Sequence, residues 1–140
     1  MKSTSILITT VLLLAAASVY VQADDRPFFT ATVPFAFTVQ NAKLPAGTYT
    51  ISVLLPYNII RVNNSTGKGV AMTNALPSRS GESKQAKLVF RRIGSHYFLA
   101  QVWEQGSNVH RDVPNGELAR ELTRKGEKAQ STTIVASRSR

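Results

Sequence analysis

Strict alternation of side chains between Phe28 and Val39 is the feature that most limits the fold of this chain. Every second residue is apolar: Phe29, Ala31, Val33, Phe35, Phe37 and Val39. After Phe28, the intervening positions hold Thr30, Thr32 and Thr38, together with Pro34 and Ala36. A period of two with β-branched and aromatic residues predicts a half-buried β-strand. Pro34 has no amide proton to donate, so it marks a sheet edge, a bulge or a bend between two sheets.

Later segments repeat this pattern and are bounded by turn residues. Strands are expected over Thr48 to Leu55, Asn58 to Val62, Val70 to Leu76, Lys87 to Ile93, His96 to Glu104 and Thr132 to Ala136. Gly94-Ser95 gives the clearest hairpin, because a two-residue connection with glycine suits a type I′ or II′ turn. A turn is expected at Asn41 to Gly47, and loops at Pro77 to Gln85 and Gln105 to Gly116.

One segment has a helical rather than a strand pattern. Leu118 and Leu122 are four residues apart and predict a short helix from Gly116 to Lys125 with a narrow apolar stripe. Asn115 is the expected N-cap, and Gly126 is the expected residue just beyond the C-terminus. Because so short a helix is unstable alone, it should dock on the sheet.

About seven strands and one helix predict a single all-β domain over residues 24–137, with 138–140 as a frayed tail. We expect a small antiparallel β-sandwich or a partly closed barrel, because helices do not alternate with the strands. The expected core residues are Phe35, Phe37, Tyr49, Ile51, Phe90, Phe98 and Val102.

The first 23 residues predict export. Lys2 supplies a basic start, residues 6–19 form an apolar run, and Val21-Gln22-Ala23 has the small-x-small pattern of a signal peptidase site. The run is shorter than the roughly 20 residues that a membrane span requires. We therefore expect a signal peptide over residues 1–23, cleaved between Ala23 and Asp24, and a periplasmic or extracellular product with no transmembrane span.

The composition narrows the chemistry and the partners. The chain has a net charge of +9, and removing Lys2 with the signal peptide lowers it to +8. This excess is compatible with envelope components or anionic polymers as partners, and it also has a simpler role in keeping the protein soluble, so the partner stays unknown. No motif indicates specific nucleic-acid recognition. The chain has no cysteine, which excludes disulfides and thiolate metal sites.

Two motifs near the start of the domain carry a resemblance. They read VPFAFTV from Val33 to Val39 and LPAGTYTI from Leu44 to Ile51, and KLVFRRIGSHYFLAQVW and ELARELTRK follow later. The chain resembles a group of small exported bacterial proteins, familiar from soil acidobacteria, with a VPFxFxV…LPAGxYxV opening. The resemblance implies an exported all-β protein. It supplies no catalytic residues, because the group has no assigned activity.

Groups that carry catalytic or metal chemistry are sparse. His110 and Asp112 are two residues apart and can point the same way, but no third metal ligand is evident. No serine lies in the G-x-S-x-G elbow that launches a nucleophile in many hydrolases. We therefore predict no catalytic residue, no metal site and no cofactor.

The candidate ligand surface lies on the clearest hairpin. Tyr97 and Trp103 have the same parity in their strand, so they are expected on one face. Exposed, they would form a stacking platform for sugars or bases; buried, they would belong to the core. Arg91 and Arg92 are adjacent in the partner strand and should point to opposite faces.

These features favour a non-enzymatic exported β-domain, acting as a structural or envelope-associated interaction module. The alternative is a module that binds an anionic polymer or a glycan through a basic or aromatic surface. An uncharacterised hydrolase ranks last, because no convergent catalytic group is evident.

Overall fold

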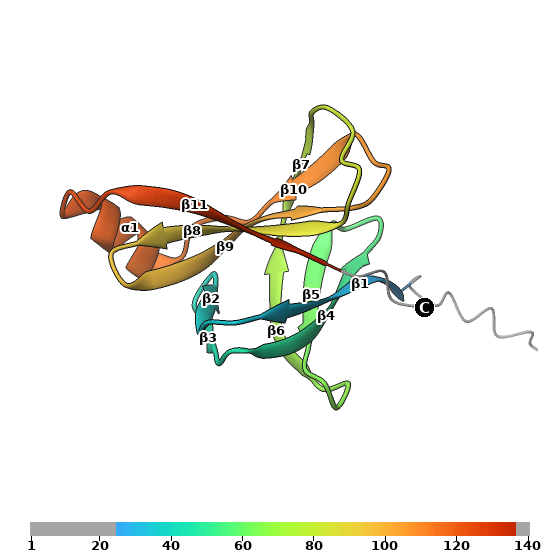
Figure 1. Cartoon of the computed structure of the whole chain (residues 1–140), viewed down its shortest axis with the longest axis horizontal. Coiled ribbons are helices and arrows are strands. Elements are labelled where there is room, and N and C mark those ends of the chain that lie inside the picture. The colour runs from blue at the N-terminus through green and yellow to red at the C-terminus, as the bar shows by residue number, and fades with distance from the viewer. Residues whose placement is uncertain (1–24, 137–140) are drawn as a thin grey trace, which may run out of the picture.

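The computed structural model describes residues 25–136, with side chains from Phe29 onward. The expected signal peptide and the tail at 138–140 lie outside the described residues. Within this part of the chain, eleven strands and one short helix form two packed sheets (Figure 1). The predicted all-β sandwich with a short C-terminal helix is confirmed. The strands outnumber the expected seven because the strand expected over Phe28 to Val39 is divided in two and three expected connections contain strands.

The first sheet, called sheet A, is a four-stranded antiparallel layer in the order β1-β4-β5-β6. Its strands are β1 (Asp25–Val33), β4 (Gly47–Leu54), β5 (Ile59–Asn63) and β6 (Gly69–Asn74). The second, sheet B, runs in the order β11-β8-β9-β10-β7. Its strands are β11 (Ala129–Val135), β8 (Lys87–Ile93), β9 (His96–Trp103), β10 (Val109–Asp112) and β7 (Leu76–Arg79).

The long alternating segment passes from one sheet to the other at Pro34. β1 ends at Val33 in sheet A, and β2 (Phe37–Val39) pairs in parallel with β9 of sheet B. β2 also pairs with β3 (Ala42–Leu44), a short strand within the segment expected to be a turn. Of the three roles considered for Pro34, the structure therefore shows the bend between sheets.

The main core lies between the inner faces of the two sheets. Six of the seven expected core residues are buried, and Phe35 is the exception because it lies at the margin and is only partly buried. Arg111 of β10 is also buried, and its Nε donates a hydrogen bond to Asn58 Oδ1 over 3.3 Å. Burial lowers the pKa of the Arg111 guanidinium, while the nearby Glu104 carboxylate raises it.

A β-bulge in the β8–β9 hairpin changes which residues share a face. Val89 pairs with Gln101, but Phe90 pairs with Leu99, so Ala100 is the extra residue. The parity of β9 therefore reverses at Ala100. Tyr97 packs against the main core, whereas Phe98 belongs to a separate cluster beneath the helix.

That helix, α1 (Glu117–Arg124), packs on the outer face of sheet B. Its Ala119, Leu118 and Leu122 contact Ile93 and Phe98, as the apolar stripe predicted. The chain leaves the helix through Gly126 at φ 87°, where Glu127 N donates to Leu122 O over 3.2 Å. The predicted C-terminal glycine is thus confirmed as part of a Schellman motif.

The predicted N-cap is wrong. Gly116 is the N-cap residue, and because glycine has no side chain it cannot cap the helix itself. Instead Asn41, in the β2–β3 turn, accepts a hydrogen bond from Glu117 N at its Oδ1 over 3.1 Å. Gly116 is required because a Cβ atom there would collide with the Gln40 carbonyl. Asn115 instead accepts a 2.6 Å hydrogen bond from Arg91 Nη1.

Two expected loops are wrong in part, because they contain strands. β7 (Leu76–Arg79) overlaps the start of the loop expected at Pro77 to Gln85, and β10 (Val109–Asp112) lies in the loop expected at Gln105 to Gly116. These strands pair antiparallel with each other, with His110 opposite Ser78. β10 also pairs with β9, placing His110 opposite Trp103.

Candidate functional site

The outer face of sheet B carries an aromatic residue held between two neighbours. Trp103 of β9 lies directly opposite Lys87 on one side and His110 on the other. The Lys87 Nζ lies 4.5 Å from the Trp103 ring centroid, and the His110 ring stacks on Trp103 at 4.3 Å with 13° between the planes. The indole is therefore engaged within the chain and does not offer a free stacking face.

A hydrogen-bonded chain extends from Trp103 across the same face. Trp103 Nε1 donates to Gln101 Oε1 over 3.0 Å, and Gln101 Nε2 donates to Asp112 Oδ1 over 3.0 Å. The second Asp112 oxygen accepts a hydrogen bond from Ser78 Oγ over 2.7 Å. We call Ser78, Ser80, Lys87, Gln101, Trp103, His110 and Asp112 the outer-face network.

This network contains a serine, a histidine and an aspartate within reach of one another. Ser80 Oγ lies 3.0 Å from His110 Nδ1, and His110 Nε2 lies 3.4 Å from Asp112 Oδ1. The order matches a hydrolytic triad with the two ring nitrogens exchanged. The Ser80 amide, however, donates to Asn108 O over 2.9 Å and so cannot stabilise an oxyanion. The geometry fastens β7 to β10.

A groove of about 240 Å³ lies beside this network on the outer face. Val89, Ala100 and Val113 are the apolar residues that line it, although the Val113 side chain belongs to the main core. Arg91, Gln101, Asp112 and Ser131 supply polar groups around it. The small Ala100 at the bulge leaves this part of the face without a large side chain. The lining is more polar than apolar, so the groove differs from the mainly apolar pockets that hold most small ligands and suits a polar partner better.

The four residues of the predicted ligand surface do not form one surface. Tyr97 stacks on Phe35 at 3.8 Å, with the Arg92 guanidinium 5.6 Å from its ring centroid. Trp103 lies on the outer face, so the expected shared face is wrong, and the bulge at Ala100 is the reason. Arg91 and Arg92 pair with Phe98 and Tyr97, which places them on opposite faces as expected.

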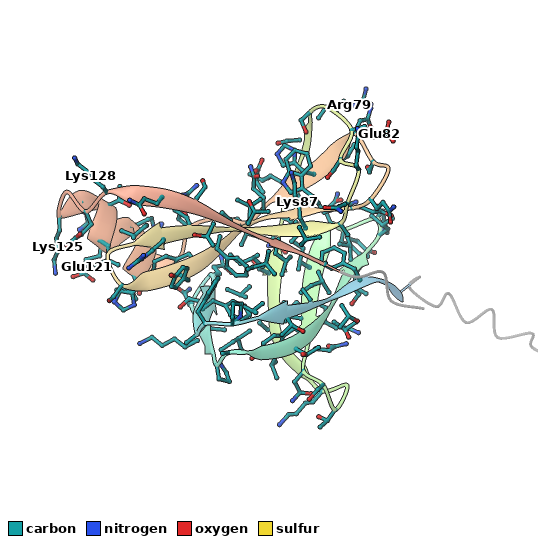
Figure 2. All side chains as sticks on the ribbon, viewed as in Figure 1. Arg79, Glu82, Lys87, Glu121, Lys125 and Lys128 are labelled. Atoms are coloured by element: carbon teal, nitrogen blue, oxygen red, sulfur yellow. The ribbon has the colours of Figure 1, made fainter. Side chains whose placement is uncertain are left out.

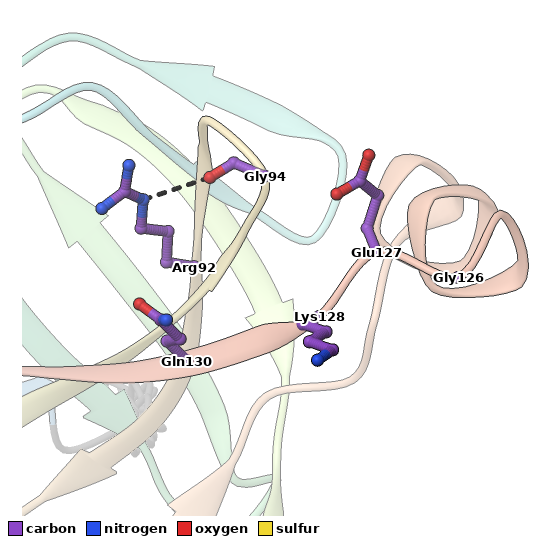
Figure 3. Close-up of a pocket in the computed structure, with 6 residues that line it drawn as sticks. All are labelled: Arg92, Gly94, Gly126, Glu127, Lys128 and Gln130. Carbon is purple, nitrogen blue, oxygen red and sulfur yellow. Dashed lines mark hydrogen bonds between the residues drawn. The ribbon is translucent and has the colours of Figure 1, made fainter.

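Arg92 borders a second hollow, of about 430 Å³, between the β8–β9 turn and the end of α1 (Figure 3). Its Nε donates to Gly94 O over 3.1 Å. The side chains of Glu127 and Lys128 point away from Arg92 and do not converge with it (Figure 3). With charges of both signs and no shared focus, this hollow is a weaker candidate than the groove.

Charge at the two ends of the sheet B layer is spread rather than concentrated. Figure 2 shows Arg79 and Glu82 at the β7 end, and Glu121, Lys125 and Lys128 at the helix end. Glu121 and Lys125 form an ion pair of 3.2 Å. Acids and bases thus alternate at both ends, which does not define a dedicated polyanion surface.

Residues 25–136 contain no cluster of three histidine, cysteine or acidic side chains that could hold a metal ion. No helix in that range has the length and apolar character to cross a lipid bilayer. Comparisons with protein-family models, curated proteins and solved structures each give no match.

Sequence reasoning missed Ser78, Ser80 and Gln101 as members of the site. The available signal was spacing, because Ser78 and Ser80 are two residues apart, as are His110 and Asp112. Residues at i and i+2 share a face of a strand. This spacing indicates paired strands only when both segments are recognised as strands, and their lack of alternating apolar residues predicts loops instead.

Proposed function

We propose that the chain is a non-enzymatic, exported interaction module that binds its partner through the groove on the outer face of sheet B. The observation that carries the proposal is the groove itself, a hollow with a mainly polar lining that includes groups from Arg91, Gln101 and Asp112. Gln101 and Asp112 are held in place by the outer-face network, so their orientation is set before a ligand arrives. Preorganised polar groups lose less entropy on binding.

The non-enzymatic part rests on how the serine, histidine and aspartate are used. Ser80 lacks its own amide as an oxyanion donor, and Asp112 accepts hydrogen bonds from Ser78 and Gln101 as well as facing His110. These contacts link three neighbouring strands of sheet B. A cross-link of this kind stabilises the face beside the groove.

The export part rests on the sequence. Lys2, the apolar run and Val21-Gln22-Ala23 support processing before Asp24. The resemblance to small exported bacterial proteins supports the same destination. An exported fraction whose intact mass begins at Asp24 is the expected result, and an unprocessed mass there would contradict it.

The chemistry of the groove favours a neutral glycan as the partner. Arg91 and Asp112 supply opposite charges, and Gln101 and Ser131 supply a neutral amide and a hydroxyl. Such a set can donate to and accept from sugar hydroxyls. A polyanion fits less well, because the Asp112 carboxylate would repel it.

The test is affinity electrophoresis through gels containing dextran, laminarin, xyloglucan or, as the anionic member, heparin. We expect retardation by a neutral polysaccharide that persists in salt. Gln101→Ala should weaken it about threefold to tenfold, the value of one hydrogen bond. Arg120→Ala, on the exposed side of α1, is the matched control and should bind normally.

A second candidate partner is an anionic polymer, favoured by the net charge of +9. Because charges are spread, we expect heparin binding to be weak and to vanish near physiological salt, where the Debye length is about 8 Å. Heparin binding that survives about 0.5 M salt, far above the roughly 0.15 M of physiological conditions, would favour this candidate. Failure to bind any neutral member of the panel would contradict the glycan proposal.

A further inference from the structure

The exposed edges of the two sheets differ in how they are protected against pairing with another strand. β1 contains Pro27 and an irregular register between Pro27 and Phe29. β6 follows a register shift beside Asn63. β7 is only four residues long and contains Pro77 and Arg79. Prolines, bulges, charges and short length are the usual devices that prevent edge-to-edge association.

β11, at the other edge of sheet B, has none of these devices. Its seven residues, AQSTTIV, contain neither a charge nor a proline. They pair with β8 in an unbroken register from Ala129 opposite Ile93 to Val135 opposite Lys87. Five of the seven side chains are exposed, including Val135 at 57%. Within residues 25–136, β8 is the one strand paired with it.

The backbone groups that face outward can be identified from one hydrogen bond. Ala136 N donates to Ala86 O over 2.9 Å, so the even-numbered residues of this strand face β8. In an antiparallel pair, the N–H and C=O of each residue point to the same side, and the side alternates. The N–H and C=O groups of Ala129, Ser131, Thr133 and Val135 therefore point away from β8.

We propose that a second copy of this chain pairs with β11 through an antiparallel β11–β11 contact centred on Thr132. This register places Ser131 opposite Thr133 and Ala129 opposite Val135, so all four outward-facing residues find partners. Hydroxyl and β-branched pairs across strands are favourable. Lys128 falls opposite Ala136 rather than another cation, so no like charges meet directly.

The pairing has a geometric consequence for the groove. A two-fold axis perpendicular to the sheet joins the two copies of sheet B into one continuous sheet with the same face upward. Ser131 lies both on β11 and beside the groove. The two grooves therefore open on the same side, close to the two-fold axis. The pairing itself does not depend on glycan binding.

Sedimentation velocity of the mature chain across a concentration series tests the pairing. We expect a dimer for the wild type. Thr133→Lys should abolish the dimer, because it adds a charge at an edge residue whose backbone N–H and C=O would pair with the second copy. It removes no hydrogen bond to β8. Thr32→Lys is the matched control, since Thr32 is an exposed threonine on the edge strand β1. It should leave the dimer intact.

Single cysteines test the register, because the chain contains no cysteine of its own. Thr132→Cys should give a reducible covalent dimer on mild oxidation, since the two copies of residue 132 meet at the axis. Thr32→Cys should remain monomeric on denaturing gels. A monomeric wild type throughout the series, a dimer insensitive to Thr133→Lys, or no cross-link at residue 132 would overturn the proposal.

Discussion

The outer face of sheet B is covered in two different ways along the same strands. At one end of β9, Phe98 lies under α1 with Ile93 and Ala119, in a small apolar cluster. At the other end, Trp103 lies between Lys87 and His110 in a network of side chains with no helix above it. The groove lies between these two regions, bordered by Arg91 and Asp112.

The apolar cluster under α1 and the outer-face network differ in what they contribute to the protein. The apolar cluster removes aromatic and aliphatic area from water, and that burial stabilises the fold. The network is only partly buried, apart from the buried His110 and the exposed Ser80, and each of its hydrogen bonds contributes about 0.5–1.5 kcal/mol. We infer that the helix end serves mainly stability, and that the network end keeps oriented polar groups available for a ligand.

Truncating Phe98 should produce the largest effect. Phe98→Ala removes a side chain that is 4% exposed and leaves a cavity beneath α1, so we expect a loss of about 3–5 kcal/mol in urea unfolding. Hydrogen exchange should show the amides of α1 losing protection first. Phe37→Ala, in the main core, is the size-matched control and should destabilise without this selectivity. A loss below about 1 kcal/mol for Phe98→Ala would mean that the helix cover adds little.

Removing the remote cap should have an intermediate effect on the same end. Asn41→Ala deletes the oxygen that accepts from Glu117 N, and the usual loss for such a cap is about 1 kcal/mol. Asn115→Ala is the control, because its hydrogen bond to Arg91 is exposed and caps no helix. Chemical denaturation of both variants shows which of the two asparagines contributes more to the stability of the protein. A larger loss of stability for Asn115→Ala than for Asn41→Ala would indicate that Asn115 caps the helix, as the sequence predicted.

The comparison also shows where sequence patterns sufficed. The alternation in β1, β4 and β5 and the Gly94-Ser95 hairpin predicted the sandwich, because each of those strands buries one face. The stripe of Leu118 and Leu122 predicted the docked helix. Local rules work where the residues that decide the structure are neighbours in the sequence.

Local sequence rules do not predict the candidate site, for three physical reasons. The bulge at Ala100 reverses the parity of β9, and no residue type in the sequence signals a bulge there. Alternation alone therefore predicts Tyr97 and Trp103 on one face of the sheet. β7 and β10 hold polar side chains that are satisfied by one another, such as Ser78 with Asp112, so they lack an apolar period. The cap from Asn41 is 76 residues from the helix that it serves.

The smallest expected effect concerns the network end, where Lys87 lies over Trp103. Lys87→Met keeps most of the side-chain length and removes the charge, so it should lower stability by about 0.5–1 kcal/mol, the usual cation–π contribution near a surface. Trp103 is the only tryptophan, so its emission reports directly on this contact. We expect a shifted emission maximum for Lys87→Met and an unchanged one for Lys84→Met, an exposed lysine outside the network.

If both variants leave the emission unchanged, Lys87 does not cover the indole. The network end would then expose an aromatic face for stacking on a sugar, and the contrast with the helix end would increase.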